Sequence, residues 1–246
     1  LLGGAFYQIS GPTGAMAAIL ASVAAQYGMD GVFQATLMAG VLLVIAGVFK
    51  LGRLTAFIPM PVITGFTSGI AVIIALGQID NFFGVSSSGG SAVEKLASYF
   101  TQGFSPDWVS VIIGLFVALF MVLFPPKWNS VVPASLIAIV LATGACIALD
   151  LQVAQVGAIP SSLLLDQRLS LGNISLSSVN GLITPAVSIA ALGMVESLLC
   201  GASAGRMTGV KLDNDRELIA QGVGNILVPF FGGIPATAAI ARTSVA

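Results

Sequence analysis

Long apolar stretches separated by short polar segments dominate the pattern of this chain. Seven stretches lack charged residues, and each can supply the ~20 apolar residues that a helix needs to cross a bilayer. In the sixth stretch we expect the helix to begin near Val179 and to continue past Glu196 to about Ser203. The seven stretches are Leu1–Met29, Gly31–Phe49, Leu54–Ile79, Trp108–Pro126, Trp128–Leu149, Leu169–Val195 and Leu218–Ala241. The pattern predicts an all-α membrane protein, and because the chain starts inside an apolar run we interpret it as a fragment.

Composition supports this prediction and excludes several functions. Hydrophobic residues make up 57% of the 246 residues and charged residues only 8%, whereas a typical soluble domain is about 25% charged. The lack of histidine excludes a Ser-His-Asp triad and a histidine metal site. A net charge of −1 without a basic block gives no footprint for nucleic-acid binding. With no nucleophile–base pair and two isolated thiols, Cys146 and Cys200, we expect neither an enzyme nor a cofactor or metal.

The distribution of basic residues predicts the orientation in the membrane. Six of the nine Lys and Arg fall on one side when the spans alternate, and cytoplasmic loops carry such an excess. They are Lys50, Arg53, Lys127, Arg206, Lys211 and Arg216. We therefore expect loops 50–53, 125–129 and 205–216 to be cytoplasmic and segments 81–107 and 150–178 to be external. The predicted location is the plasma membrane, which in a bacterium is the inner membrane.

Two segments interrupt the helical pattern in similar ways. They are residues 8–15 (QISGPTGA) and residues 232–239 (GGIPATAA). Because Pro is favoured in the first turn of a helix, each segment predicts an extended stretch that ends in a half-helix near mid-membrane. The seven predicted crossings place the segments in repeats of opposite orientation, the pattern of inverted-repeat transporters. Half-helix N-termini suit an anion, whereas two proline kinks or packing contacts are the alternative.

Glu196 and Arg242 are the two charged residues at membrane depth beside these segments. An ionisable side chain inside a span is a functional candidate. Burial favours the neutral form of Glu196, which can then lie near an anion and carry a proton. A structural hydrogen-bonding role is the alternative. Arg242, two turns beyond Pro235, either raises the local potential for an anion or extends toward the membrane interface.

Three runs of sequence resemble the SulP anion permease family, which includes the animal sulfate transporters and prestin. Residues 8–16 (QISGPTGAM) look like the third-helix motif of that family. Residues 215–222 (DRELIAQG), followed by Gly224-Asn225, and residues 230–237 (FFGGIPAT) resemble its run between helices 8 and 10. The resemblance covers essentially the whole chain, and the run from residue 215 onward is highly specific.

The resemblance implies a UraA-like inverted-repeat fold of seven plus seven transmembrane helices. About helices 3–10 are present, with helices 3 and 10 as half-helices. Residues 1–50 (helices 3–4) and 179–246 (helix 8 to the start of helix 10) would belong to the core domain. Residues 54–150 (helices 5–7) would belong to the gate domain, and residues 151–178 would form an external loop. The STAS domain that usually follows is absent.

The family places its anion between the N-termini of helices 3 and 10. The acidic position of helix 8 matches Glu196, the expected proton-coupling residue. Cys200 replaces a Thr that helps to bind sodium in bicarbonate-transporting relatives, so it is a possible neighbour of the ion site. Because a thiol is a poor sodium ligand, we expect proton rather than sodium coupling. The implied substrate-binding residues are Gly11, Pro12, Thr13, Gly14, Ala15, Thr237, Ala238, Ala239, Ala241 and Arg242.

These features together predict a secondary active transporter of a small anion such as sulfate, a dicarboxylate or bicarbonate. The resemblance implies proton coupling, an elevator-like movement of core against gate, and a homodimer in the lipid bilayer. An uncoupled anion channel or exchanger is one alternative. A nucleobase–proton symporter of the same fold is another, although residues 232–241 lack the carboxylate that such proteins use to read ring N–H groups.

Overall fold

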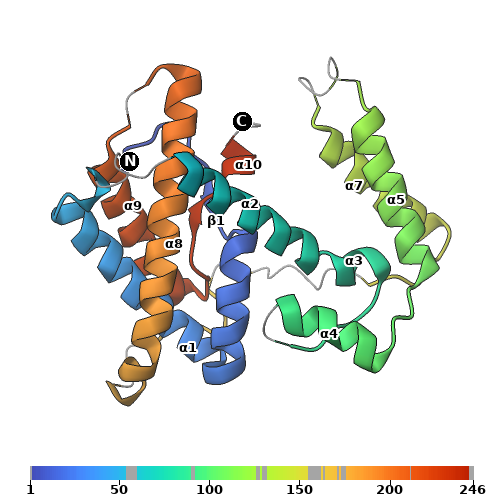
Figure 1. Cartoon of the computed structure of the whole chain (residues 1–246), viewed down its shortest axis with the longest axis horizontal. Helices are drawn as coiled ribbons and strands as arrows, with labels where there is room; N and C mark the ends of the chain where they lie inside the picture. Colours follow the sequence, from blue (N-terminus) through green and yellow to red (C-terminus); the bar gives the residue numbers. More distant parts are fainter. Residues whose placement is uncertain are drawn as a thin grey trace. The chain divides into compact units, whose positions relative to one another are not determined.

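The computed structural model describes residues 2–53, 60–89, 92–125, 128, 132–154, 162, 164–170, 172, 176–210 and 212–243, and helices make up most of it (Figure 1). In chain order the elements are β1 (Ser10–Gly11), α1 (Gly14–Val48), α2 (Met60–Gly77), α3 (Ile79–Phe83), α4 (Ala92–Gln102), α5 (Trp108–Leu123), α7 (Ala134–Ala148), α8 (Leu176–Thr208), α9 (Asn214–Leu227), the 3₁₀ turn η3 (Val228–Phe231), β2 (Thr237–Ala238) and α10 (Ile240–Thr243).

The chain divides into two compact units. The first unit joins Leu1–Ile73 to Pro160–Ala246, and the second unit comprises Ile74–Ile159. The assignment of these parts to core and gate domains stays a prediction, as does the orientation in the membrane. Lys127, Lys211 and parts of the predicted external loop 151–178 lie outside the described residues.

Helices α1, α8 and α9 form the centre of the first unit (Figure 1). Apolar side chains from all three helices make one buried cluster, because the charge-free faces of these helices pack against each other. Its buried members are Met16, Leu20, Val23, Val32, Ala35, Ala39, Leu43, Leu182, Ile189, Ala190, Leu198 and Leu218. Glycines bring two backbones close together, since a Cβ atom on Gly40 would lie 2.8 Å from the carbonyl oxygen of Gly222.

Helix α1 consists of two helical pieces that meet at Gly28. This residue has φ +66° and ψ −172°, a conformation that L side chains rarely adopt. Residues 14–27 and 29–48 therefore run in different directions (Figure 1). The break lies two residues before Asp30, the charge that separates the first two predicted spans.

Helix α8 contains the helix predicted from Val179 to about Ser203 and extends beyond it at both ends. It runs through Pro185 from Leu176 to Thr208. By length and composition, Ile19–Val48 and Val179–Gly205 are long and apolar enough to cross a membrane. Shorter apolar helices cover Ser68–Phe83, Trp108–Leu123 and Ala134–Ala148.

The last charge-free stretch, Leu218–Ala241, contains part of a helix, a 3₁₀ turn and the predicted non-helical segment. Helix α9 begins earlier, after the N-cap Asp213, and ends at Leu227. The 3₁₀ turn η3 follows and is closed by Gly232 in the left-handed conformation, with φ +80°. Beyond Gly232 the chain is extended as far as Ala238, so the apolar character of this stretch does not produce one continuous helix.

The second unit contains α3, α4, α5 and α7. Asp107 caps α5, because its carboxylate accepts hydrogen bonds from the N–H groups of Val109 and Ser110. None of the α5 side chains is buried, as expected for an apolar helix that faces lipid or further helices. The rings of Phe83 and Tyr99 pack edge-to-face against Phe104 and hold the segment between α4 and α5.

Candidate functional site

The two irregular segments predicted from the sequence lie side by side and pair as strands. Strands β1 and β2 are antiparallel, with Ser10 opposite Ala238 and Gly11 opposite Thr237. The N–H of Ala239 also donates to the carbonyl oxygen of Ile9, at 2.9 Å. Because buried backbone groups need partners, this pairing allows two extended stretches to exist between helices.

Each strand leads directly into the start of a helix. Thr13 is the N-cap of α1, and its hydroxyl accepts a hydrogen bond from the N–H of Met16 at 3.4 Å. On the other side, β2 is followed by the single described turn of α10, Ile240–Thr243. The structure thus brings the starts of α1 and α10 to one place, as the two-segment pattern predicts.

The carboxyl group of Glu196, on α8, faces both helix starts. Its Oε2 atom accepts a hydrogen bond from Thr13 Oγ1 at 3.0 Å and one from Thr237 Oγ1 at 2.5 Å. The two hydroxyl oxygens lie 3.4 Å apart. Glu196 is only 4% exposed and Thr237 only 2%. Residues from the two ends of the chain and from α8 therefore meet at one carboxyl oxygen.

Ser197, the residue after Glu196, binds strand β2 through a hydrogen bond. The hydroxyl oxygen of Ser197 accepts a hydrogen bond from the N–H of Ala238 at 3.3 Å, and Ser197 is fully buried. One turn of α8 thus contacts β2 through a side-chain acid and a side-chain hydroxyl. This contact fixes β2 against α8 in addition to its pairing with β1.

Arg242 lies against the first strand. Its Nη2 atom donates to the carbonyl oxygen of Pro12 at 3.1 Å, while its side chain remains exposed. A Cβ atom on Gly11 would lie 2.6 Å from Nη1 of Arg242, so the absence of a side chain at Gly11 leaves room for the guanidinium group. The positive charge is therefore held beside the start of α1.

The other predicted site residues differ in their exposure to solvent. Ala15, Ala238 and Ala239 are buried, Gly14 is exposed, and the side chain of Ala241 lies outside the described residues. The thiol of Cys200, one turn along α8 from Glu196, donates to Thr243 Oγ1 at 3.2 Å. No group of three or more Cys, Asp or Glu comes together among the described residues.

Asn225 is a positioning residue that the sequence analysis missed. Its side-chain amide, which is 1% exposed, forms two hydrogen bonds of 2.8 Å with the backbone of Ala236. This pair of bonds replaces a strand partner for the residue just before β2. An Asn inside an otherwise apolar stretch was the available signal, since a buried amide needs partners.

Glu217 is the second residue that the sequence analysis missed. Asp213 does cap α9, accepting a hydrogen bond from the N–H of Arg216. Glu217, however, is 3% exposed. Its neighbours Asp215 and Arg216 suggest a water-facing turn, but its own carboxylate points toward the segment before α1.

A cavity of about 300 Å³ lies between α1 and α8, away from the hydrogen bonds of Glu196. It is lined by side chains that include Ile19, Tyr27, Thr184 and Pro185, and Thr13, Glu196 and Thr237 do not line it. The Thr13–Glu196–Thr237 cluster is closed by its own hydrogen bonds. Gly14 and Arg242, which follow Thr13 and Thr237 along the chain, are exposed.

Comparison with known proteins gives a consistent result. The model of the sulfate permease family matches residues 1–246. A putative sulfate transporter, YvdB, from Bacillus subtilis is 39% identical over 99% of this chain and 47% of its own length. The bicarbonate transporter BicA of Synechocystis is 30% identical over 100% of this chain and 44% of its own length. The chain therefore spans about half the length of the curated relatives it matches.

Solved structures confirm the predicted fold. The transmembrane domain of a cyanobacterial bicarbonate transporter, BicA, matches with a TM-score of 0.87 at 29% identity, over 100% of this chain and 64% of that chain. The structure of SLC26A9 matches with a TM-score of 0.80 at 19% identity, which shows the fold alone. The chain is thus part of a UraA-like inverted-repeat transmembrane domain. It belongs to the sulfate permease family.

Proposed function

We propose that this chain contains the anion site of a proton-coupled secondary anion transporter. The observation that carries the proposal is the meeting of β1–α1, β2–α10 and Glu196 at one buried carboxyl oxygen. The relatives named above are a putative sulfate transporter and a bicarbonate transporter, and we extend anion transport to the protein that contains this chain.

The start of α1 supplies donors for the anion. The first N–H groups of a helix have no partner within that helix. At α1 the N–H of Met16 bonds to Thr13 Oγ1 and that of Ala17 bonds to Thr13 O. The N–H groups of Gly14 and Ala15 have no bond within the described part of the chain. These two groups, the helix dipole and the nearby Arg242 guanidinium favour a small anion at this point.

Glu196 is the proposed carrier of the coupling proton. In the described residues its hydrogen bonds go to Oε2, so Oε1 is the oxygen that can take up a proton without breaking a bond to Thr13 or Thr237. Burying a carboxylate beside an anion is costly, and protonation removes that cost. Anion and proton would therefore occupy the site together, and movement of the core domain would carry both across the membrane.

The test is a Glu196→Gln variant of the full-length protein in proteoliposomes. The Gln carbonyl oxygen can accept both threonine hydroxyls as Oε2 does, but the amide cannot exchange a proton with solvent in the way a carboxyl group does. We expect pH-gradient-driven uptake of labelled sulfate or bicarbonate to be lost while anion exchange at equal pH persists.

The matched control is Glu94→Gln, which removes an exposed carboxylate on α4 and should leave uptake unchanged. Unchanged gradient-driven uptake in Glu196→Gln would remove Glu196 from the coupling role. Loss of both modes of transport in Glu196→Gln would instead assign it to anion binding.

A further inference from the structure

A buried carboxylate on α9 holds the segment that precedes α1. Glu217 Oε2 accepts hydrogen bonds from the N–H groups of Gly4 and Ala5, at 2.9 and 3.1 Å. Its Oε1 accepts from Gln8 Nε2 at 2.6 Å and Gln221 Nε2 at 2.9 Å. Each oxygen of the carboxylate thus has two N–H partners, which is the full acceptor capacity of an ionised Glu.

The four hydrogen bonds of this contact suit Glu217 as an ionised carboxylate, which only accepts. All four partners of Glu217 are N–H donors, and hydrogen bonds to an ionised acceptor are stronger than those to a neutral one. Glu217 also lies in the first turns of α9, where the helix dipole favours a negative charge. Two further bonds hold the same segment: Asp213 N–H donates to Gly4 O and Arg216 Nε to Leu2 O.

The contact continues from Glu217 to the candidate anion site through Gln221. The amide nitrogen of Gln221 carries two protons, and besides Glu217 it donates to Ser10 Oγ at 2.6 Å. Ser10 is the residue of β1 that pairs with Ala238 of β2. Gln221 therefore connects a buried charge on α9 to the strand that ends at Thr13.

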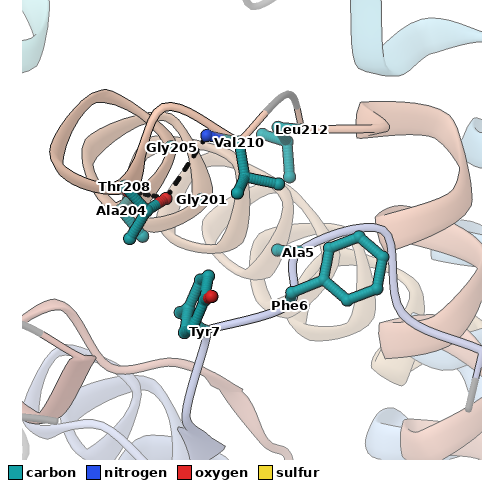
Figure 2. Close-up of a pocket in the computed structure, with 9 residues that line it drawn as sticks. All are labelled: Ala5, Phe6, Tyr7, Gly201, Ala204, Gly205, Thr208, Val210 and Leu212. Atoms are coloured by element: carbon teal, nitrogen blue, oxygen red, sulfur yellow. Dashed lines mark hydrogen bonds between the residues drawn. The ribbon is translucent and has the colours of Figure 1, made fainter.

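The opposite side of this segment is bounded by the last turns of α8. Figure 2 shows Ala5, Phe6 and Tyr7 facing a pocket of about 10 Å³ at this end of α8. That volume is about the space of one water molecule, so the pocket cannot accept an anion. Gly201 allows this close packing, because a Cβ atom there would lie 3.2 Å from Gln8 Oε1 and 2.8 Å from Leu212.

We propose that Glu217 and Gln221 are positioning residues for anion binding. They hold residues 4–10 between α8 and α9 and so fix the place of β1, Thr13 and the first N–H groups of α1. Neither side chain needs to touch the anion. The inference rests on the function proposed above, and it assigns the position of the binding site to contacts made at α9.

A double-mutant cycle on the Gln221–Ser10 hydrogen bond tests this role. Gln221→Leu, Ser10→Ala and the double variant are compared with the wild type in the full-length protein, by uptake of labelled sulfate and of labelled bicarbonate. Each single variant should raise KM about three- to tenfold with little change in the maximal rate, because net hydrogen-bond free energies are about 1 kcal/mol. The double variant should be no worse than the more affected single variant.

The control is Asn81→Leu, which also removes an exposed amide hydrogen bond, but one that joins Asn81 to Gln78 within a single turn. It should leave KM unchanged. Multiplicative effects of Gln221→Leu and Ser10→Ala would overturn the proposal, and so would an unchanged KM in both.

Hydrogen exchange of the same proteins separates this inference from the proposed function. Gln221→Leu should speed amide exchange in residues 9–11 and 238–239, and Glu217→Ala should do so at Gly4 and Ala5. A wild-type protein that transports neither sulfate nor bicarbonate overturns the proposed function, and the exchange result then decides on the positioning role alone. Unchanged exchange in Gln221→Leu overturns that role whatever the transport data show.

Discussion

The hydroxyl group of Thr13 both caps helix α1 and hydrogen-bonds to Glu196 on α8. Its oxygen accepts from the N–H of Met16, and its proton goes to Glu196 Oε2. One side chain thus uses both its donor and an acceptor site, so the start of α1 and the position of the carboxyl group are coupled. A larger side chain at this position cannot make these bonds and must displace its neighbours.

Thr13→Trp is expected to abolish anion binding in the full-length protein, because an indole would fill the space beside the N–H groups of Gly14 and Ala15. Binding can be measured by isothermal titration or by a thermal-shift assay with added sulfate. Thr13→Ser retains the hydroxyl and the cap and should bind as the wild type does. Thr101→Trp, at an exposed position of α4, controls for the added indole. Normal binding by Thr13→Trp would contradict the placement of the site.

The hydrogen bonds of Asp80 predict how the stability of the second unit depends on pH. Burial raises the pKa of Asp80, but hydrogen bonds from Ser87 Oγ and Tyr99 Oη and the charge of Lys95 outweigh it and hold the pKa below 3.8. A carboxyl group with a lowered folded-state pKa contributes stability above its unfolded pKa, and this contribution is lost as pH falls through the folded value.

We therefore expect the contacts between α3 and α4 to be intact at neutral pH and to weaken only below pH 3.8. Hydrogen exchange of residues 80–107, measured against pH, monitors this change. Asp80→Asn should show faster exchange at neutral pH and a smaller acid response. An identical pH response in the variant would show that other groups control this segment.

At the scale of elements, the contact between α1 and α9 depends on glycine. A Cβ atom on Gly40 would lie 2.7 Å from the backbone nitrogen of Ile226, and one on Gly222 would lie 2.7 Å from Gly40 O. Because the obstructing atoms belong to backbone, the helices must separate to accept a side chain. Strain of this kind in a packed interior typically costs about 1–3 kcal/mol.

Gly40→Ala should lower the thermal unfolding temperature of the full-length protein in detergent. Gly144→Ala is the matched control, since no described residue lies within 4 Å of a Cβ atom at that position in α7. Ala is the better helix former by about 1 kcal/mol, so the control should be neutral or stabilising. Equal destabilisation by both substitutions would contradict a specific role for Gly40.

The helices and the two irregular segments could be predicted because their signals are local. An apolar run between charges marks a span, and Gly, Pro and Thr together mark the start of a half-helix. The pairing of Ser10 with Ala238 could not be predicted in this way, because each partner is a small residue at an opposite end of the chain. Burial of Glu217 was missed for the same reason, since three of its four donors, Gly4, Ala5 and Gln8, lie more than 200 residues away along the chain.

At the scale of the whole molecule, the division into two units allows a direct test of elevator-like transport. We propose that the first unit moves as one body relative to the second. Spin labels at Val41 and Ile112, exposed residues of different units, should give a distance distribution that changes when sulfate and a pH gradient are added. A pair within the first unit, Val41 and Val187, should not change. A change in the second pair alone would contradict movement of the unit as one body.

The pairing of β1 with β2 also has a consequence for the synthesis of the protein. Ser10 and Gly11 leave the ribosome long before their partners Thr237 and Ala238. At about 5–20 residues per second, the interval is on the order of tens of seconds. During this time the first half-helix lacks its strand partner, and until residue 196 has been made it also lacks the acid on α8. Residues 10–11 thus gain their strand partner only after residue 237 has been made, and termination before that residue would leave the proposed anion site unformed.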